Sequence, residues 1–162
     1  MSTIEEATEA HADGVAAVFA PYVTGSVVTF ETVPPTAEQW RAKIRESRLP
    51  FLVLTEADAV LGYALATPWR PKPAYRHTVE TTIYLAPEAT GRGHGRRLLD
   101  ELLKRCADQG ARQAIAVVVD SGSPASRNLH RAAGFIDAGV LRGVGFKQDR
   151  WLDTLLLQRA LG

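Results

Sequence analysis

Apolar residues recur every three or four positions early in the chain and predict an amphipathic helix over residues 8–23, followed by a glycine turn. The positions that mark this helix are Val15, Val18, Phe19 and Tyr22. Residues 26–35 end in two prolines and predict a loop with a short extended piece. Thr36 and Gln39 form the T-x-x-Q pattern of a capping box, which predicts a second helix that runs to Arg48.

The pattern then changes to that of strands. Residues 50–56, "PFLVLTE", are nearly all apolar, and residues 59–69, "AVLGYALATPW", alternate. The short "EAD" turn between them predicts a β-hairpin. A third strand is predicted over residues 78–86, where Pro87 ends it.

The second half alternates between the two patterns. It predicts a helix over residues 95–109, a buried strand over 112–119, a helix that opens at residues 121–124, and strands over 134–146 and 150–161. Periodicity alone also allows a helix for the last segment. The predicted order is two helices followed by β-β-β-α-β-α-β-β, an α/β or α+β fold with helices on both faces of a sheet.

Composition narrows the class of protein. The chain has 162 residues, without an internal repeat or linker, so we expect residues 1–162 to form a single domain. A net charge of +1 gives no overall field that favours nucleic acid. The longest apolar run, residues 114–119, is too short to span a bilayer, and the acidic start lacks a signal core. The one cysteine, Cys106, lies among leucines at helical spacing, which indicates a core residue in a reduced, cytoplasmic compartment.

A glycine-rich, basic loop stands directly before the helix at 95–109. Residues 90–95 read T-G-R-G-H-G. Free backbone N–H groups at a helix N-terminus bind phosphate readily, and glycines allow the backbone to approach an anion closely. Neither the P-loop pattern nor the G-x-G-x-x-G dinucleotide pattern fits. From these residues alone, a phosphate cradle and a plain surface turn are both open.

The order of strand, glycine loop, helix, strand and a last helix ending in "NLHRAAGF", residues 128–135, resembles the GNAT superfamily of acetyl-CoA-dependent N-acetyltransferases. "TFETVPPT", "RPKPAYRHTVETTIYL" and "GFKQDRWLD" resemble, more narrowly, the branch that acetylates phosphinothricin and methionine sulfone or sulfoximine. The resemblance covers nearly the whole chain. It implies a mixed, mostly antiparallel sheet of six to seven strands flanked by about four helices, and a homodimer.

The resemblance also implies where acetyl-CoA, the co-substrate, binds. Strands 78–86 and 112–119 splay apart, the pantetheine arm lies in the gap, and the pyrophosphate lies on the amides of the glycine loop. The side chain of His94 is expected to face solvent. Thr90 stands where the family has Arg or Gln, and Ser123 precedes a proline where the family tends to have Asn, so that contact is shorter or lost. The implied cofactor-binding residues are Ile83, Tyr84, Leu85, Gly91, Arg92, Gly93, His94, Gly95, Arg96 and Ser123.

Two residues are candidates for the chemistry. Glu80 lies in a strand of Thr, Val and Ile, where partial burial can raise the pKa of a carboxyl toward neutrality, and the resemblance makes it the general base. His130 stands where many of these enzymes carry a tyrosine, and it is the candidate acid for the leaving thiolate. From the pattern alone, Glu80 is a solvated strand residue or a partner of Arg76, and His130 is a core histidine. No His, Cys or carboxylate spacing predicts a metal site.

The proline-rich loop at residues 68–77 is expected to bind the acceptor amine. Its arginines can pair with a carboxylate or phosphinate, and Tyr75 offers an aromatic wall. Phe30 and Trp151 are expected to close the pocket, whereas Trp40 is expected in the core. The substrate-binding candidates are Phe30, Arg70, Pro73, Ala74, Tyr75 and Arg76.

The predicted function is transfer of an acetyl group from acetyl-CoA to the amino group of a small amino-acid analogue. A protein N-terminal or lysine acetyltransferase, or a non-catalytic acyl-CoA-binding sensor, are the alternatives. The stiff 68–77 loop favours a closed pocket over an open peptide groove.

Overall fold

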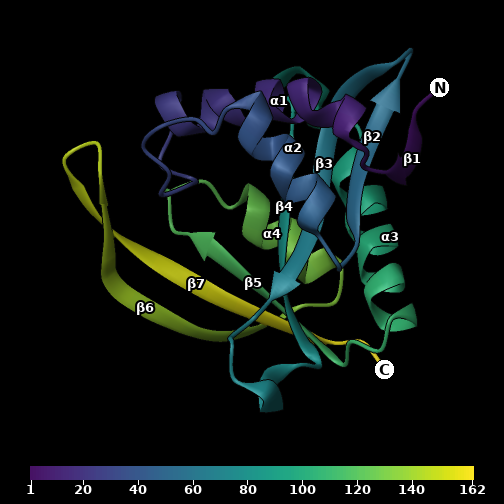
Figure 1. The fold of residues 1–162 in the computed structure, drawn as a ribbon. Coiled ribbons are helices and arrows are strands. Elements are labelled where there is room, and N and C mark those ends of the chain that lie inside the picture. The colour runs from purple at the N-terminus through teal and green to yellow at the C-terminus, as the bar shows by residue number, and fades with distance from the viewer.

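The computed structural model describes residues 1–162 and is built around one seven-stranded sheet (Figure 1). Its strands are β1 (Thr3–Glu6), β2 (Phe51–Glu56), β3 (Ala59–Pro68), β4 (Thr78–Leu85), β5 (Gln113–Val119), β6 (Ile136–Lys147) and β7 (Arg150–Ala160). They follow the order β1-β2-β3-β4-β5-β7-β6. Every neighbouring pair is antiparallel except β4 and β5, which run parallel. The predicted mixed, mostly antiparallel sheet is confirmed.

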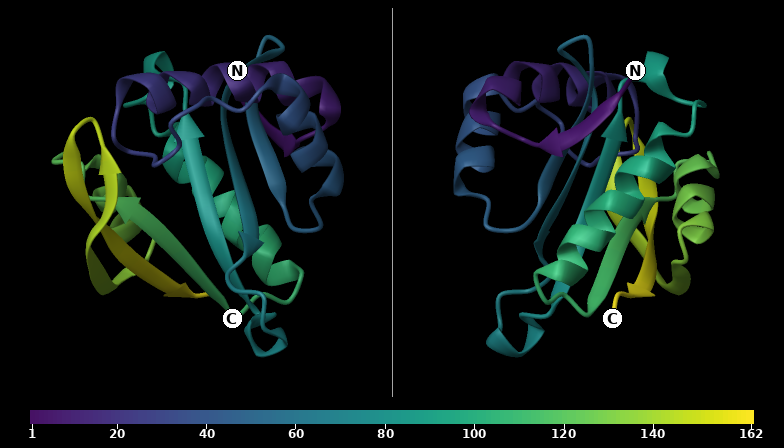
Figure 2. Two further views of the ribbon diagram at one scale, coloured as in Figure 1. Left: turned by 60° about the vertical axis from the view of Figure 1, so that its left-hand side comes forward. Right: turned by 90° about the vertical axis from the view of Figure 1, so that its right-hand side faces the viewer.

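Four α-helices cover the two faces of the sheet (Figure 2). They are α1 (Ala12–Gly25), α2 (Ala37–Glu46), α3 (His94–Asp108) and α4 (Ala125–Ala132). Helices α1 and α2 pack on one face, and α3 and α4 lie on the other. The helices are all too short or too polar to cross a membrane.

The capping box predicted for α2 is present. Gln39 N donates to Thr36 Oγ1 at 3.1 Å, and Thr36 N donates to Gln39 Oε1 at 2.9 Å. These two bonds satisfy backbone groups that have no partner at a helix start.

Two expectations at the ends of the chain are corrected. Strand β1, which precedes the first helix, was not predicted, because its four residues are mostly polar and it is held by backbone pairing with β2. The first helix begins with a 3-10 turn at Glu9–His11, so α1 itself starts later than residue 8. The last segment, β7, is a strand, and it pairs with both β5 and β6.

The core is divided by the sheet into two layers. On the α3 side, Leu98, Leu99 and Leu102 are fully buried. Cys106 lies in the same cluster, and burial raises the pKa of its thiol to about 11. The thiol therefore stays protonated and unreactive, as predicted for a core residue. On the α1 and α2 side, Trp40 packs among other aromatic rings, which confirms it as a core residue.

The parallel pair β4–β5 separates partway along its length. Pairing runs from Thr78 opposite Gln113 to Thr81 opposite Ala116 and then stops, although both strands continue. The left view of Figure 2 shows the two strands diverging beyond this point. Because side chains alternate along a strand, residues 80, 82 and 84 face α1 and α2, and residues 81, 83 and 85 face α3.

Gly62 on β3 has no room for a side chain. A Cβ there would lie 2.5 Å from Leu85 Cδ2 and 2.9 Å from the backbone oxygen of Tyr84. We expect Gly62→Ala to lower the free energy of unfolding by about 1–3 kcal/mol in urea denaturation, because a backbone atom of β4 must move. Gly25→Ala is the matched control, since nothing lies within 4 Å of its Cβ position. Equal losses in both variants would contradict the prediction.

Candidate active site

A cavity of about 910 Å³ passes through the sheet where β4 and β5 separate. Its lining comes from both faces: α1 and α2 supply Tyr22 and Lys43, whereas α3 and α4 supply Gly95 and His130. This volume is at the upper end of what small-ligand sites offer, and it suits an elongated ligand that reaches from one face to the other.

The glycine loop forms one end of this cavity. Gly91 and Gly93 have φ angles of +77° and +78°, a left-handed conformation that favours glycine. The backbone N–H groups of residues 91–93 donate to no other group in the chain, and the first amides of α3 lack helical partners. These free amides and the helix N-terminus fit a pyrophosphate.

The predicted cofactor-binding residues divide into two groups. Those that line the cavity are Ile83, Tyr84, Leu85, Gly91, Gly93, Gly95, Arg96 and Ser123. Arg92 is exposed outside it. The carbonyl of Leu85 already accepts a hydrogen bond from the Tyr22 hydroxyl, so one of its two lone pairs is occupied.

His94 is buried, which corrects the expectation that it faces solvent. It is 9 % exposed and lies outside the cavity lining, and neither ring nitrogen has a hydrogen-bond partner. The reason is the start of α3, which includes His94 and places it four residues before Leu98 on the same inward face.

Glu80 projects toward the α1 and α2 side of the cavity. Its carboxylate makes no hydrogen bond or ion pair within the chain, although it lines the cavity. Partial burial raises the pKa of Glu80, and the cations Arg70 and Lys43 oppose that rise. The site therefore holds an unpaired carboxylate whose proton affinity is higher than that of a solvated glutamate.

His130 lines the cavity from α4 and is 3 % exposed. Its Nδ1 lies 2.7 Å from the carbonyl oxygen of Ser126, and its ring packs edge-on against Phe135. Because a carbonyl oxygen can only accept, Nδ1 carries the proton, and Nε2 of the neutral ring has a free lone pair. Burial lowers the pKa of His130, so the neutral form is favoured.

Phe30 lines the acceptor side and is held there by β6. A Cβ at Gly145 would lie 2.2 Å from Phe30 Cζ, so the ring packs directly on the β6 backbone. Lys147 Nζ, at the end of the same strand, donates to Thr29 O at 2.9 Å. These two contacts fix the loop that carries Phe30.

The other acceptor candidates lie outside the cavity lining. Pro73, Ala74 and Tyr75 form a 3-10 turn beyond the end of β3, in which Tyr75 is 44 % exposed. Arg76 donates to Pro73 O within that turn, and Arg70 stacks on Trp69. Of this loop, only Arg70 acts on the site, through the pKa of Glu80.

Trp151 does not close the pocket, which corrects another expectation. It is 74 % exposed and packs on Phe146 at the far end of the β6–β7 hairpin. Trp151 pairs with Phe146 on β6 and precedes Thr154, the first residue of β7 that pairs with β5, so the end of the hairpin that carries Trp151 extends beyond β5.

Several polar residues that line the cavity were not predicted, and three of them, Thr81, Thr154 and Lys43, bear on its chemistry. Thr81 and Thr154 line it with buried hydroxyl oxygens that have no hydrogen-bond partner, which a bound ligand could supply. Lys43 lines it from α2. The one sequence signal for the location of Lys43 was its position next to Trp40 and Ile44, which form the buried face of α2.

A second cavity of about 410 Å³ lies near the C-terminus, and His77 and Arg112 are among its lining residues. It contains no predicted catalytic or cofactor-binding residue. No group of three or more His, Cys, Asp or Glu side chains is arranged to hold a metal ion.

Comparisons with known proteins agree with this geometry. Residues 17–135 match the Acetyltransferase (GNAT) family. The chain is 48 % identical over 150 residues to a phosphinothricin N-acetyltransferase of Alcaligenes faecalis, covering 91 % of this chain and 76 % of the relative. It is 33 % identical over 161 residues to an L-methionine sulfoximine/L-methionine sulfone acetyltransferase of Pseudomonas aeruginosa, covering 97 % and 93 %.

A solved structure is similar over almost the whole fold. It is a GNAT superfamily phosphinothricin acetyltransferase from Sinorhizobium meliloti in complex with acetyl-CoA. The TM-score is 0.91 at 40 % sequence identity, and the alignment covers 99 % of this chain and 89 % of that one.

Proposed function

The chain belongs to the GNAT family of acetyltransferases, and we propose that it transfers the acetyl group of acetyl-CoA to the amino group of a small amino-acid analogue. The proposed acceptors bear a compact phosphinate, sulfone or sulfoximine group, as the names of the relatives indicate. One observation carries the proposal: a single cavity crosses the sheet, with free loop amides at one end and the unpaired Glu80 carboxylate at the other.

Acetyl-CoA supplies an activated acetyl thioester when it is bound. The residues proposed to hold it are the backbone of Ile83, Tyr84 and Leu85, the amides of residues 91–96, and Ser123. The left-handed φ angles of Gly91 and Gly93 support this assignment, because successive N–H groups in such a loop can converge on an anion. Arg96 adds a cation at the same end, where Asp100 holds its Nε at 2.9 Å.

We propose Glu80 as the general base that takes the proton of the acceptor ammonium. A raised pKa suits this role, because a base whose pKa lies nearer the working pH removes a proton more effectively. His130 is proposed to protonate the leaving sulfur. The neutral ring offers a lone pair at Nε2, so Nε2 would first take the second proton that the acceptor nitrogen loses as the amide forms, and would then pass that proton to the sulfur.

Phe30, held against Gly145, is proposed as the wall that limits the size of the acceptor. The 68–77 loop is proposed to contribute the charge of Arg70, and the remaining residues of this loop, Pro73, Ala74, Tyr75 and Arg76, to border the entrance. A peptide acceptor would have to displace Phe30, so a small molecule is the preferred substrate.

We also propose that residues 1–162 act as one domain and that the protein works in the cytoplasm.

We further propose that two copies of the chain form a homodimer through β6. Strand β6 is the edge of the sheet. An edge strand with exposed apolar side chains favours pairing with another chain. The exposed apolar residues of the β6–β7 hairpin are Ile136, Val140, Leu141, Val144, Phe146 and Trp151.

The acceptor class can be tested by steady-state kinetics. We expect measurable acetylation of phosphinothricin or methionine sulfone and little acetylation of peptides that carry a free N-terminus or lysine, because Phe30 is proposed to limit the size of the acceptor. The measurement is kcat/KM for both classes. A preference for peptides would replace the small-molecule assignment, and acetyl-CoA binding without any turnover would favour an acyl-CoA sensor.

Gly93→Val is expected to weaken acetyl-CoA binding by at least tenfold, roughly 1.4 kcal/mol, in calorimetry. The variant must abandon a φ of +78°, which reorients the loop amides. Gly110→Val is the matched control, because Gly110 has a φ of +97° and open space at the other end of α3. It should lose stability but retain acetyl-CoA affinity. Unchanged affinity in a folded Gly93→Val variant would contradict the amide cradle.

Glu80→Gln is expected to keep acetyl-CoA affinity while turnover falls by about 10²–10⁴-fold, the range for loss of a general base. Because the pKa of Glu80 is raised, the acid limb of the wild-type kcat/KM profile should lie above the ordinary range of a glutamate. The limb should be absent from any residual activity of the variant.

The same variant separates catalysis from folding. A carboxyl whose folded pKa is raised destabilises the fold once the pH exceeds its unfolded pKa, and most fully above its folded pKa. Glu80→Gln removes that penalty, so its stability at neutral pH should equal or exceed that of the wild type. Near-normal turnover across the pH range would remove Glu80 from the mechanism.

A further inference from the structure

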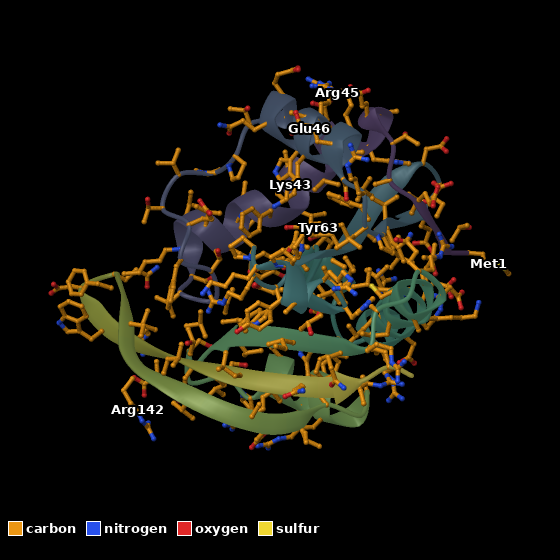
Figure 3. The ribbon with its side chains drawn as sticks, turned by 60° about the horizontal axis from the view of Figure 1, so that its bottom comes forward. Met1, Lys43, Arg45, Glu46, Tyr63 and Arg142 are labelled. Carbon is orange, nitrogen blue, oxygen red and sulfur yellow. The ribbon has the colours of Figure 1, made fainter.

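Lys43 brings a positive charge to the acceptor end of the cavity. It follows Trp40 by three residues on α2, and its Nζ lies 5.4 Å from the centroid of the Trp40 ring. In Figure 3, Lys43 lies on the side of α2 nearer to Tyr63, whereas Arg45 and Glu46 lie farther out. Both Lys43 and Tyr63 line the cavity.

This ammonium has no carboxylate partner, unlike its neighbours on the same helix. Arg41 Nε pairs with Glu38 at 3.0 Å, and Arg45 pairs with Glu9 at 3.0 Å. Arg96, the other Lys or Arg that lines the cavity, pairs with Asp100 at the opposite end. Lys43 is therefore the unpaired cation of the cavity.

Lys43 and Glu80 act on the same region. The charge of Lys43 lowers the pKa of Glu80, which requires the two groups to lie within electrostatic reach. The other ionisable groups around this end are Arg70, which acts on Glu80 more strongly, and Glu31, Tyr63 and Tyr84, which line the cavity. An acceptor whose amine lies at Glu80 would thus have a free ammonium nearby.

We propose that Lys43 determines acceptor specificity by binding an oxyanion of the acceptor. The inference deepens the proposed function and rests on it. An ammonium is a compact donor that pairs with any oxyanion, so the group bound is the carboxylate or the side-chain phosphinate. The aromatic face of Trp40 supports the ammonium from one side and leaves its other N–H donors free for the ligand.

Three acceptors distinguish the two anions: L-phosphinothricin, with a carboxylate and a phosphinate; methionine sulfone, with a carboxylate alone; and methionine sulfone carboxamide, with neither. In Lys43→Gln, KM should rise by about fivefold for each acceptor that presents the bound anion, as expected for a partly solvated ion pair. A rise for both acids identifies the carboxylate, and a rise for phosphinothricin alone identifies the phosphinate. KM for the carboxamide should not change.

The pH profile supplies a second readout that a purely structural role would not move. Removal of the Lys43 charge raises the pKa of Glu80, so the acid limb of kcat/KM should shift to higher pH in Lys43→Gln. Lys43→Arg should retain both the limb and the selectivity. Arg45→Gln, on the same helix but outside the cavity, should leave both unchanged.

Equal changes in KM for all three acceptors in Lys43→Gln, or no change for any of them, would overturn this inference. The proposed function would still stand in that case, provided that the wild-type enzyme acetylates these acceptors. An unshifted acid limb in Lys43→Gln would also overturn it. A wild-type enzyme that acetylates none of the three would overturn the proposed function and the role of Lys43 together.

Discussion

The pairing of β4 with β5 lasts for only four residue pairs, and the site depends on where it stops. Up to Thr81 and Ala116 the two strands share a parallel ladder, which fixes their relative position. Beyond it, neither strand can satisfy the other's backbone groups, and the space between them becomes part of the cavity. Unpaired strand edges inside a fold are costly unless a ligand or solvent reaches them. A ligand with its own amide groups can complete both edges, and for this reason the break in the sheet is the proposed binding site.

The break also gives the two candidate catalytic side chains access to one cavity from opposite faces of the sheet. Glu80 projects to the side of α1 and α2, and His130 reaches the cavity from α4. Alternation along β4 makes this division strict, since a shift by one residue would turn Glu80 toward the leucines of α3. Gly62 lets β3 lie close enough to β4 to hold that register, with the Tyr84 carbonyl only 2.9 Å from where a side chain would begin. Packing between β3 and β4 thus sets the direction of Glu80, the proposed general base.

Local patterns predicted most of the architecture. Apolar periodicity predicted α1, the capping box predicted α2, and the start signal around Pro124 predicted α4, whereas β2, β3 and β5 were recognised by alternation or by continuous apolar runs. Strand β1 was missed because its pairing is made by the backbone. The same limit applies to the site. The glycine loop and Glu80 could be located from sequence and family resemblance, whereas Lys43 reaches the cavity only because α2 packs across the aromatic cluster of Trp40 and Tyr63.

Histidine and tryptophan show why residue type was a poor guide to position. His94 was expected at the surface because it stands in a basic loop, but its place four residues before Leu98 puts it on the buried face of α3. Trp151 was expected in the pocket because it is aromatic, but it lies at the end of the β6–β7 hairpin that extends beyond β5. In both cases the position of the residue within its helix or hairpin determines whether the side chain is buried, and the chemical type of the side chain does not.

The charges around Glu80 oppose one another, and this balance makes the carboxylate usable. Burial raises its pKa and so favours the protonated form, which cannot accept a proton. Arg70 and Lys43 draw the pKa back down without forming an ion pair, which would occupy the oxygens. Arg70 is held by stacking on Trp69, and Lys43 lies over Trp40. Aromatic faces therefore hold both cations within electrostatic reach of Glu80, while its carboxylate lone pairs remain free, as the proposed role of general base requires.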